Sequence, residues 1–328
     1  MEKGTPFLKV ENLEVKYTSG KRTIQAVNDV SFTLERGKTL GLVGETGAGK
    51  TTIAKAIMRI LPTPPAKLKS GSVELDGISI MDLKEEEMRK IRGSMISMIF
   101  QDPMTALNPL ISIGEQICES VLLHNNSISR QEAVKKSIEM LEMVGIPGER
   151  YEEFPFQFSG GMKQRVVIAM ALACNPALLL ADEPTTALDV TIQAQVLELI
   201  KDLQNRFGTS MILITHDLGV VAETCDQVAV IYAGEIVEMG DKNMLYKHAS
   251  HPYTKGLFDS LPHTGDVRLK PIEGMPPDPA NLPEGCRFHP RCPRASEKCR
   301  SGYMEMKEIA RGHFCRCCMV EQEETIHG

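Results

Sequence analysis

A short glycine-rich segment near the start of the chain carries the groups that bind phosphate. Its residues are, in order, Gly44, Glu45, Thr46, Gly47, Ala48, Gly49, Lys50, Thr51 and Thr52. Glycines let backbone N–H groups close around an anion, and a helix that starts within the loop adds the partial positive charge of its N-terminus. In such a P-loop, Lys50 reaches the outer phosphates and the Thr51 hydroxyl binds Mg²⁺. The segment therefore predicts a site for a nucleoside triphosphate and its Mg²⁺.

An apolar run further along the chain ends in two adjacent carboxylates, Asp182 and Glu183. At the carboxyl end of a parallel strand, Asp182 can hold Mg²⁺ directly or through water, which leaves Glu183 free to polarise an attacking water. Adjacent acidic residues at the start of a helix also occur simply because they complement the helix dipole. The phosphate-binding loop upstream favours the catalytic interpretation.

Two more polar residues follow apolar runs. His216 comes after residues 211–215 and can contact a terminal phosphate and orient the water, although a lone histidine of this kind is usually structural. Gln101 comes after residues 95–100 and carries an amide that can reach the metal or the water. Neither residue is informative when taken singly.

Ser159, Gly160 and Gly161 precede a helical stretch over residues 163–173. A serine and two glycines at a helix start form a second anion-binding nest, with Ser159 as helix cap and phosphate donor. An ordinary helix N-terminus needs the same residues. On this segment alone both interpretations stay open.

The elements that must position these groups alternate between strands and helices. Residues 8–43 predict short strands with turns between them, and the P-loop lies between an apolar strand and an amphipathic helix that runs to residue 60. The later segments predict a helical insert over 113–143, a helix over 191–207, and strands over 95–100, 178–181, 211–215, 227–232 and 235–239. Strands that alternate with helices predict an α/β fold whose parallel sheet is covered on both faces.

The composition excludes several classes of protein. With 328 residues, 42% hydrophobic and 24% charged, the chain has the composition of an ordinary globular protein. Its net charge of −6 argues against a nucleic-acid partner. No apolar run approaches the roughly 18 residues that a membrane span needs, and residues 1–15 lack the apolar core of a signal peptide. We therefore expect a cytosolic chain.

A change in composition after Ser260 predicts a domain boundary. Prolines accumulate between Pro262 and Pro283, which favours an extended linker. We expect one domain over residues 1–261, and a linker with a small extension over 262–328. The extension has few aliphatic residues, so a bound metal can supply the stability that a core of its own cannot.

Most of the nine cysteines lie in this extension: Cys286, Cys292, Cys299, Cys315, Cys317 and Cys318. Disulfides are disfavoured in the cytosol, so such a cluster indicates metal or redox chemistry. Five residues separate Cys286 from Cys292 and six separate Cys292 from Cys299, unlike the tight knuckles of structural zinc sites. Four thiolates on irregular loops can instead hold a [4Fe–4S] cluster, with Zn²⁺ or unliganded thiols as alternatives.

The P-loop, Gln101, the segment 159–161, the acidic pair at 182–183, the segment 187–189 and His216 together resemble an ABC-type ATPase. Their order and approximate spacing match that family over residues 6–260. The resemblance implies a P-loop NTPase cassette with a mixed sheet core, an antiparallel β subdomain and a helical subdomain over about residues 102–175.

The same resemblance implies a role for each site residue. Tyr17 would stack on the adenine of ATP, and Asp189 would lie in a loop that communicates across a dimer. The segment 159–161 of one subunit would complete the ATP site of the other in a head-to-tail pair. The remaining implied roles are Mg²⁺ binding by Thr51, Gln101 and Asp182, and hydrolysis by Glu183, His216, Gln101 and Lys50.

Finer features resemble the oligopeptide, dipeptide and nickel importer branch of that family. They are residues 100–109, residues 158–165 and residues 251–254. The general family has Leu at the position of Phe158 and Gln at that of Met162, and both departures are usual in the peptide branch. The resemblance is strongest to a dipeptide importer ATPase.

This branch implies a subunit that hydrolyses ATP to power import of dipeptides or oligopeptides. Its partners would be two transmembrane permease subunits, a second ATPase that is a paralogue or another copy, and, indirectly, an extracytoplasmic binding protein. The chain would then lie at the cytoplasmic face of the cell membrane. A nickel or other small-solute importer is an alternative. A soluble ABC ATPase acting on DNA or ribosomes fits less well, because the chain has neither a coiled-coil insertion nor a second cassette.

The cysteine extension resembles the C-terminal extension of peptide-importer ATPases, with residues 285–293 as its signature. Some members of that group carry a [4Fe–4S] cluster. The resemblance selects Cys286, Cys292 and Cys299 as ligands, with Cys317, four residues after His313, as the fourth. Whether Cys315 or Cys318 replaces Cys317, and whether the cluster is a structural staple or a sensor, stays open.

Overall fold

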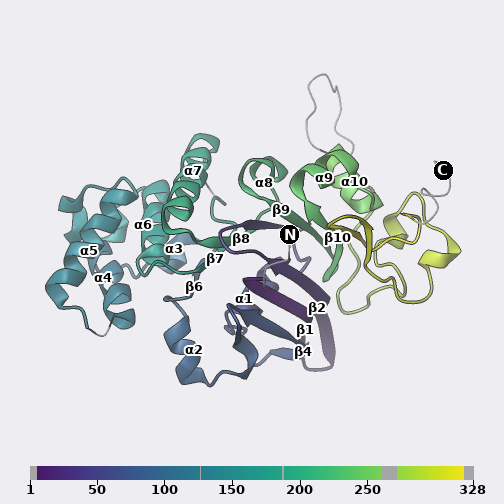
Figure 1. The fold of residues 1–328 in the computed structure, drawn as a ribbon, viewed down its shortest axis with the longest axis horizontal. Helices are drawn as coiled ribbons and strands as arrows, with labels where there is room; N and C mark the ends of the chain where they lie inside the picture. Colours follow the sequence, from purple (N-terminus) through teal and green to yellow (C-terminus); the bar gives the residue numbers. More distant parts are fainter. Residues whose placement is uncertain (1–5, 126, 187, 261–271, 321–328) are drawn as a thin grey trace. The chain divides into compact units, whose positions relative to one another are not determined.

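The computed structural model describes residues 6–125, 127–186, 188–260 and 272–320 (Figure 1). The chain forms two units. The first comprises Met1–Leu34, Leu40–Met81 and Thr215–Gly328. The second comprises Glu35–Thr39 and Asp82–Ile214.

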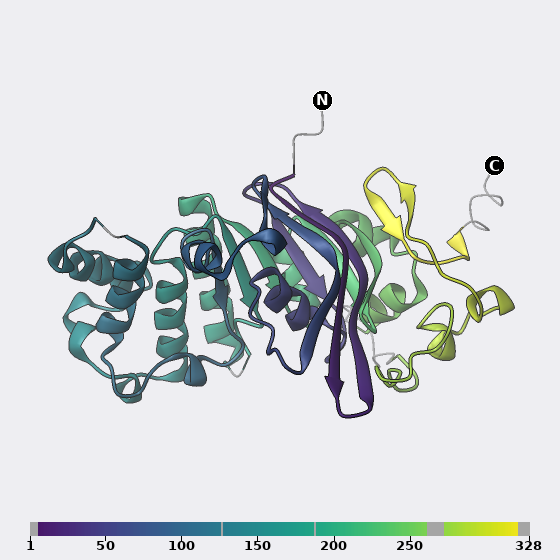
Figure 2. The same ribbon diagram turned by 90° about the horizontal axis from the view of Figure 1, so that it is seen from below.

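The first unit contains an antiparallel sheet with the strand order β2-β1-β4-β5. Its strands are β1 (Leu8–Ser19), β2 (Arg22–Leu34), β4 (Ala66–Leu75) and β5 (Ile78–Ser79). β1 and β2 form the long hairpin drawn in purple in Figure 2. The sequence predicted several short strands in this region, and the prediction was wrong in length. Register shifts around Asn12, whose backbone has φ 49°, let one strand continue where the alternation breaks.

The first unit also holds strands in the order β11-β12-β10-β9-β3. β3 (Thr39–Val43) pairs in parallel with β9 (Gln227–Tyr232), and the other neighbours pair antiparallel. The sheet is therefore mixed. The remaining elements are β10 (Glu235–Asp241), β11 (Lys307–Ala310), β12 (His313–Cys315), α1 (Lys50–Ile57), α8 (Leu218–Thr224), α9 (Lys242–His248) and α10 (Pro252–Asp259).

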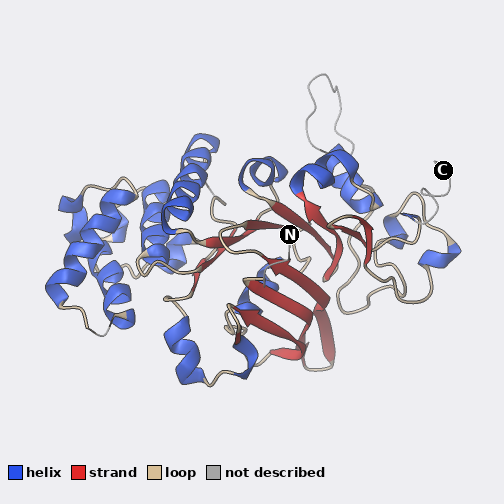
Figure 3. Cartoon of the chain, in the orientation of Figure 1, coloured by secondary structure: helices blue, strands red, loops and turns tan. Residues whose placement is uncertain are grey.

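The second unit has the parallel strands β6 (Ile96–Ile99), β7 (Leu178–Asp182) and β8 (Ser210–Ile214). The parallel pairing of these strands confirms the prediction of a parallel sheet from the alternation of strands with helices. Every residue of the three strands is buried. Its helices, blue in Figure 3, are α2 (Glu85–Ile91), α3 (Pro103–Ala106), α4 (Ile113–His124), α5 (Arg130–Met143), α6 (Gly160–Leu172) and α7 (Val190–Phe207).

Side-chain caps explain where several of these helices begin. Ser129 accepts a hydrogen bond from the Glu132 N–H, and the Glu132 carboxylate accepts one from the Ser129 N–H. This confirms the capping box predicted before α5. Ser112 caps α4 in a similar way, accepting from the Glu115 N–H.

Residues 272–320 contain little regular structure, and most of the segment runs as loops. Two short 3₁₀ turns, at His289–Arg291 and Glu297–Cys299, precede β11 and β12. β12 pairs with β10, so this segment extends the edge of the mixed sheet (Figure 2). Part of the linker predicted between Pro262 and Pro283 lies outside the described residues. Within the described part of the chain, no helix is long and apolar enough to cross a membrane.

Candidate nucleotide site

The P-loop connects β3 to α1, as its sequence predicted. At Gly44 a Cβ atom would lie 2.1 Å from the carbonyl oxygen of Ile231, and the backbone has φ 150°, so only glycine fits. The Lys50 Nζ donates to the carbonyl oxygens of Gly44 (2.7 Å) and Glu45 (3.0 Å), which closes the loop. Gly49, the N-cap of α1, offers no side-chain cap, so the first turn of the helix presents its positive end to an anion.

Tyr17 and Thr215 of the first unit contact α1 and the strand that leads into this loop. The Tyr17 hydroxyl is 3.5 Å from the Thr52 hydroxyl, which places an aromatic ring beside the start of α1. The Thr215 N–H donates to the Leu42 carbonyl at the end of β3. His216 follows at once and is exposed. Asp217 caps α8 through the Gly219 and Val220 N–H groups.

The acidic pair of the second unit sits where β7 ends. Asp182 is buried at 3% exposure, and the Glu183 backbone adopts the left-handed conformation with φ 45°. A non-glycine residue in that conformation stores strain, which is typical of functional sites. The Glu183 carboxylate accepts hydrogen bonds from the Gln101 amide (3.1 Å) and the Thr186 hydroxyl (2.8 Å). The structure thus brings Gln101 to Glu183 and fixes the direction of the carboxylate.

The segment 159–161 forms the N-terminus of α6. Ser159 caps the helix by accepting a hydrogen bond from the Met162 N–H, and Ser159 and Gly160 are exposed. A Cβ atom on Gly161 would lie 2.7 Å from the Ile192 Cγ2 of α7, so this glycine lets the two helices approach. Asp189 caps α7 by accepting from the Ile192 N–H, which gives it a structural role of its own.

Family models match two parts of the chain. Residues 27–186 match the model described as "ABC transporter", and residues 237–299 match "Oligopeptide/dipeptide transporter, C-terminal region". The dipeptide transport ATP-binding protein DppD of Bacillus subtilis (strain 168) is 48% identical over 319 residues, which cover 96% of this chain and 95% of DppD. The oligopeptide transport ATP-binding protein AppD of the same organism is 47% identical, with coverage of 97% and 98%.

The chain belongs to the ABC transporter ATP-binding family. A solved structure supports the same assignment: the dimeric, post-hydrolysis ATP-binding cassette MJ0796 bound to ADP and Pi matches with a TM-score of 0.65 and 30% identity, covering 72% of this chain and 98% of that one. The expectations of a P-loop NTPase cassette with a mixed sheet and of an ATPase are confirmed.

Both units of this ABC cassette carry residues expected at the site. Tyr17, the P-loop and His216 belong to the first unit. Gln101, Ser159, Asp182, Glu183 and Asp189 belong to the second. The individual roles that the resemblance implies for these residues remain predictions.

The cysteines of the C-terminal extension, called the tail from here on (described residues 272–320), divide into two environments. Cys286, Cys292, Cys299, Cys317 and Cys318 line one cavity of about 10 Å³, and the sulfur atoms of Cys299 and Cys318 are 3.5 Å apart. Cys315 is buried in β12, paired with Glu238 of β10. Across the described residues, no group of three or more His, Cys, Asp or Glu side chains is placed to hold a metal ion.

Burial governs the acidity of these thiols. It raises the pKa of Cys286 to about 12 and also raises the pKa values of Cys292 and Cys317. At Cys299, burial raises the pKa, but hydrogen bonds from Ser296 outweigh it and the net pKa is lowered. Binding of a cation at this cavity would therefore have to displace protons from most of the thiols.

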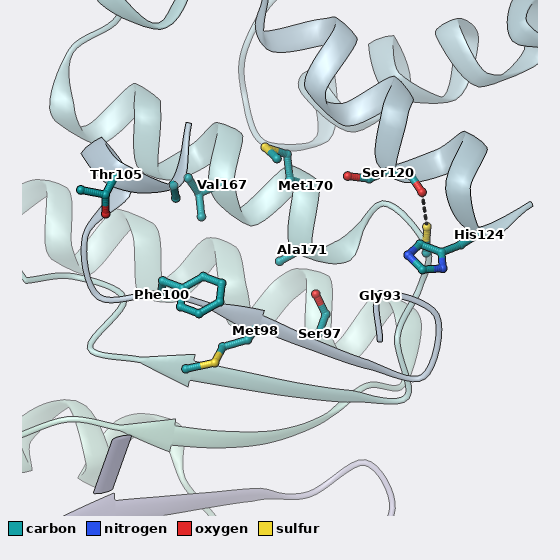
Figure 4. Close-up of a pocket in the computed structure, with 12 residues that line it drawn as sticks. Gly93, Ser97, Met98, Phe100, Thr105, Ser120, His124, Val167, Met170 and Ala171 are labelled. Atoms are coloured by element: carbon teal, nitrogen blue, oxygen red, sulfur yellow. Dashed lines mark hydrogen bonds between the residues drawn. The ribbon is translucent and has the colours of Figure 1, made fainter. Parts of the chain in front are cut away.

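A larger cavity of about 530 Å³ lies in the second unit, and its lining residues are shown in Figure 4. Met98 and Phe100 come from β6 and the loop after it, Val167 and Met170 from α6, and His124 from the end of α4 (Figure 4). The cavity therefore begins at the residue that directly precedes Gln101.

Two residues outside the P-loop motif hold the loop, and the sequence did not point to either of them. The Tyr253 hydroxyl accepts a hydrogen bond from the Glu45 N–H, and the Arg291 guanidinium binds the Glu45 carboxylate. Both residues lie inside segments singled out for other reasons, 251–254 and 285–293. The sequence carried no signal that either segment contacts the loop, because more than 200 residues separate the partners.

Proposed function

We propose that this chain is the ATP-hydrolysing subunit of a peptide importer. The observation that carries the proposal is the combination of a closed P-loop with a glutamate whose carboxylate is oriented by Gln101 and Thr186. Relatives over nearly the full length are named dipeptide and oligopeptide transport ATP-binding proteins. A match to the C-terminal region of oligopeptide/dipeptide transporters supports the peptide class over nickel or another small solute.

The chemistry needs positioning and charge stabilisation rather than a covalent intermediate. Lys50 and the backbone of residues 44–52 bind the phosphates of the substrate MgATP, and Thr51, Gln101 and Asp182 bind its Mg²⁺. Glu183 polarises the attacking water, with its carboxylate held by two donors, and His216 contacts the terminal phosphate. Tyr17 stacks on the adenine from its place beside Thr52.

A second cassette subunit completes each site in this proposal. Ser159 and Gly160 stand exposed at the N-terminus of α6, where the helix dipole favours an anion. In a head-to-tail dimer, this nest would contact the ATP that is bound by the partner. The partner is either a paralogue or a second copy. Support comes from the dimeric state of the structurally similar cassette MJ0796.

The permease subunits would dock over the cavity of Figure 4, at the cytoplasmic face of the membrane. Phe100 lines this cavity and is 42% exposed, and Met104, which directly precedes the lining residue Thr105, is 61% exposed. Exposed apolar groups in one region indicate a protein contact. Phe100 directly precedes Gln101, so a partner seated here is linked to the Glu183 carboxylate through one residue.

The tail would bind a [4Fe–4S] cluster through Cys286, Cys292, Cys299 and one of Cys317 and Cys318, with Zn²⁺ as the alternative. Cys286, Cys292, Cys299, Cys317 and Cys318 line one cavity, whereas Cys315 lies outside it. In the described residues these thiols are not grouped so as to hold a metal ion, so the segments that carry them must rearrange for a cluster to bind. When bound, such a cluster ties loops together and can exchange an electron. Widening of the space of about 10 Å³ between the thiols must accompany its binding.

Reconstitution tests the transport function. The chain is combined in vesicles with the permease subunits and binding protein encoded beside it, and ATP-dependent uptake of labelled dipeptides, oligopeptides and Ni²⁺ is measured. Uptake of peptide is expected. Uptake of Ni²⁺ alone would overturn the peptide assignment, and ATPase activity that responds only to DNA or ribosomes would overturn the transport function.

A further inference from the structure

The buried side chain of Arg291, in the C-terminal tail, forms an ion pair with Glu45, the acidic residue of the P-loop. Arg291 has a side-chain exposure of 5%, and its two terminal nitrogens bind the two Glu45 carboxylate oxygens at 2.9 and 3.0 Å. Two parallel bonds of this kind fix direction as well as charge. The same guanidinium donates to the Tyr232 hydroxyl at 3.3 Å and to the Glu273 carbonyl at 3.0 Å, so it is itself locked in place.

Each polar group of Glu45 has a defined partner from a different segment. Its N–H donates to the Tyr253 hydroxyl at 3.0 Å, its carbonyl accepts from the Lys50 Nζ at 3.0 Å, and its carboxylate is bound by Arg291. Tyr253 is fully buried. The second residue of the P-loop is therefore fixed from the loop, from α10 and from the tail.

Aromatic packing holds this part of the tail beside the P-loop. The rings of Tyr232 and Tyr253 lie 4.6 Å apart, and Phe288 of the tail packs against them at 5.2 and 5.4 Å. Phe288 is 2% exposed and lies three residues before Arg291. Removing Phe288 or Arg291 would therefore loosen the same contact.

A second part of the tail also borders the loop. Pro276, Pro277 and Pro279 line a cavity of about 150 Å³ together with residues 45–48. The Gln25 N–H of β2 donates to the Pro279 carbonyl at 3.0 Å, which anchors this stretch. The tail thus borders the P-loop through residues 276–279 as well as through Arg291.

Charge gives the Arg291 contact a direct bearing on nucleotide binding. Glu45 brings a carboxylate into a loop whose ligand is a polyanion, and like charges at close range repel each other. Pairing with Arg291 cancels that charge and holds the carboxylate in a fixed direction. Without Arg291, the Glu45 carboxylate loses this partner while its backbone stays in the phosphate-binding loop.

We propose that Arg291 is a positioning residue for the P-loop, through which the C-terminal tail sets the affinity for MgATP. This inference rests on the proposed function, because it takes residues 44–52 as the MgATP site. Arg291 directly precedes Cys292, so a change at the thiols of the tail would occur one residue away from the contact between Arg291 and Glu45.

The test is a double-mutant cycle on the full chain, with the Kd for MgATP measured by titration calorimetry and KM and kcat by phosphate release. Arg291→Met is expected to raise Kd and KM about 10-fold to 100-fold, because it leaves a partly buried charge unpaired, and to leave kcat within about 3-fold. Glu45→Gln is expected to have a smaller effect. In the Glu45→Gln background, Arg291→Met should cost less than about 3-fold, since no charge is left to compensate. Additive effects would overturn the proposal.

Arg316→Met is the matched control. Arg316 is also buried, with 6% side-chain exposure, and ties the tail to Asp29 at 3.3 Å, away from the P-loop. This variant should lower the melting temperature and leave the Kd for MgATP within about 2-fold. A rise in Kd equal to that of Arg291→Met would mean that only general docking of the tail matters, which overturns the specific role.

Two further variants keep the result of this test interpretable. Arg291→Lys retains the charge and loses the paired geometry, so it should fall between the wild type and Arg291→Met, and it serves if Arg291→Met fails to fold. Lys50→Ala reports on the proposed function by itself. Normal MgATP binding by Lys50→Ala would refute the P-loop assignment, whereas loss of binding there with no effect at Arg291 would refute this inference alone.

Discussion

The P-loop and the cysteine tail hold their polar groups in different ways. The loop is closed by backbone contacts, by glycines that leave no room for a Cβ atom and by a lysine only a few residues away. The tail is held by buried side-chain pairs to distant segments: Arg291 to Glu45, Arg316 to Asp29 and His313 to Glu238. The comparison indicates that the loop tolerates almost no change in shape, whereas the tail depends on charged pairs between distant segments.

The largest expected effect concerns the chemistry of the cassette. Glu183→Gln should lower ATP turnover about 100-fold or more while MgATP still binds, because the amide keeps the shape of the side chain and cannot polarise water as a carboxylate does. Steady-state phosphate release and equilibrium binding separate the two quantities. Glu198→Gln, an exposed position on α7, is the matched control and should be neutral. Turnover that survives in Glu183→Gln would mean that another group activates the water.

The second prediction tests the rigidity of the loop. Gly44→Ala should abolish MgATP binding, because the new Cβ atom would lie 2.1 Å from the Ile231 carbonyl. Gly20→Ala provides the contrast, since Gly20 also has positive φ, at 58°, and nothing lies within 4 Å of its Cβ position. That variant should cost only about 1 kcal/mol of stability. Equal loss of MgATP binding in the two variants would show that the loss does not depend on the contact with Ile231.

Local patterns explain which elements could be predicted from the sequence. Strands β6 to β10 and the helix α7 are marked by buried runs or by helical periodicity, and the capping box at Ser129 uses neighbouring residues. The P-loop is local in the same sense. The lengths of β1 and β2 were not predictable, because bulges near Asn12 depend on its contacts with Asp29 and Ser31 on the other strand.

Contacts between distant residues explain what the sequence could not show. Arg291 and Glu45 are 246 residues apart, and neither sequence motif contains a pattern that indicates contact with the other residue. β12 was not predicted because a strand of three residues has no periodicity and forms through pairing with β10. The pairing of Gln101 with Glu183 was expected only as far as a resemblance implied that both serve one site.

The third prediction asks whether the tail is organised by a metal. Cys286→Ser should lower the bound iron of anaerobically expressed protein to near zero, because one of four ligands is lost. Cys315→Ser should retain iron, since Cys315 lies outside the cavity. Iron, sulfide and zinc analysis with absorbance spectra checks both. A colourless, iron-free wild type with full activity would refute the cluster, and unchanged iron in Cys286→Ser would refute this ligand.

The smallest expected effect concerns Glu238, which ties β12 of the tail to β10. Its carboxylate is fully buried, accepts from the Ser250 and His251 N–H groups at 2.7 and 3.0 Å, and pairs with the His313 Nε2 at 2.8 Å. Burial opposes ionisation of Glu238, but these hydrogen bonds outweigh it and hold its pKa below the ordinary value of 4.5. We expect Glu238→Gln to cost about 1–3 kcal/mol at pH 7, because an amide cannot accept all of these bonds.

The dependence of that cost on pH is the informative part. Since the folded pKa of Glu238 lies below the unfolded one, its stabilisation is complete above about pH 4.5 and is lost as the pH falls through the folded pKa. The difference in unfolding free energy between wild type and Glu238→Gln, measured in urea, should therefore shrink below that pH. Glu297→Gln, in an exposed pair with Arg300, should change stability by less than about 0.5 kcal/mol at every pH. A difference at Glu238 that does not vary with pH would show that packing, and not charge, holds this edge of the tail.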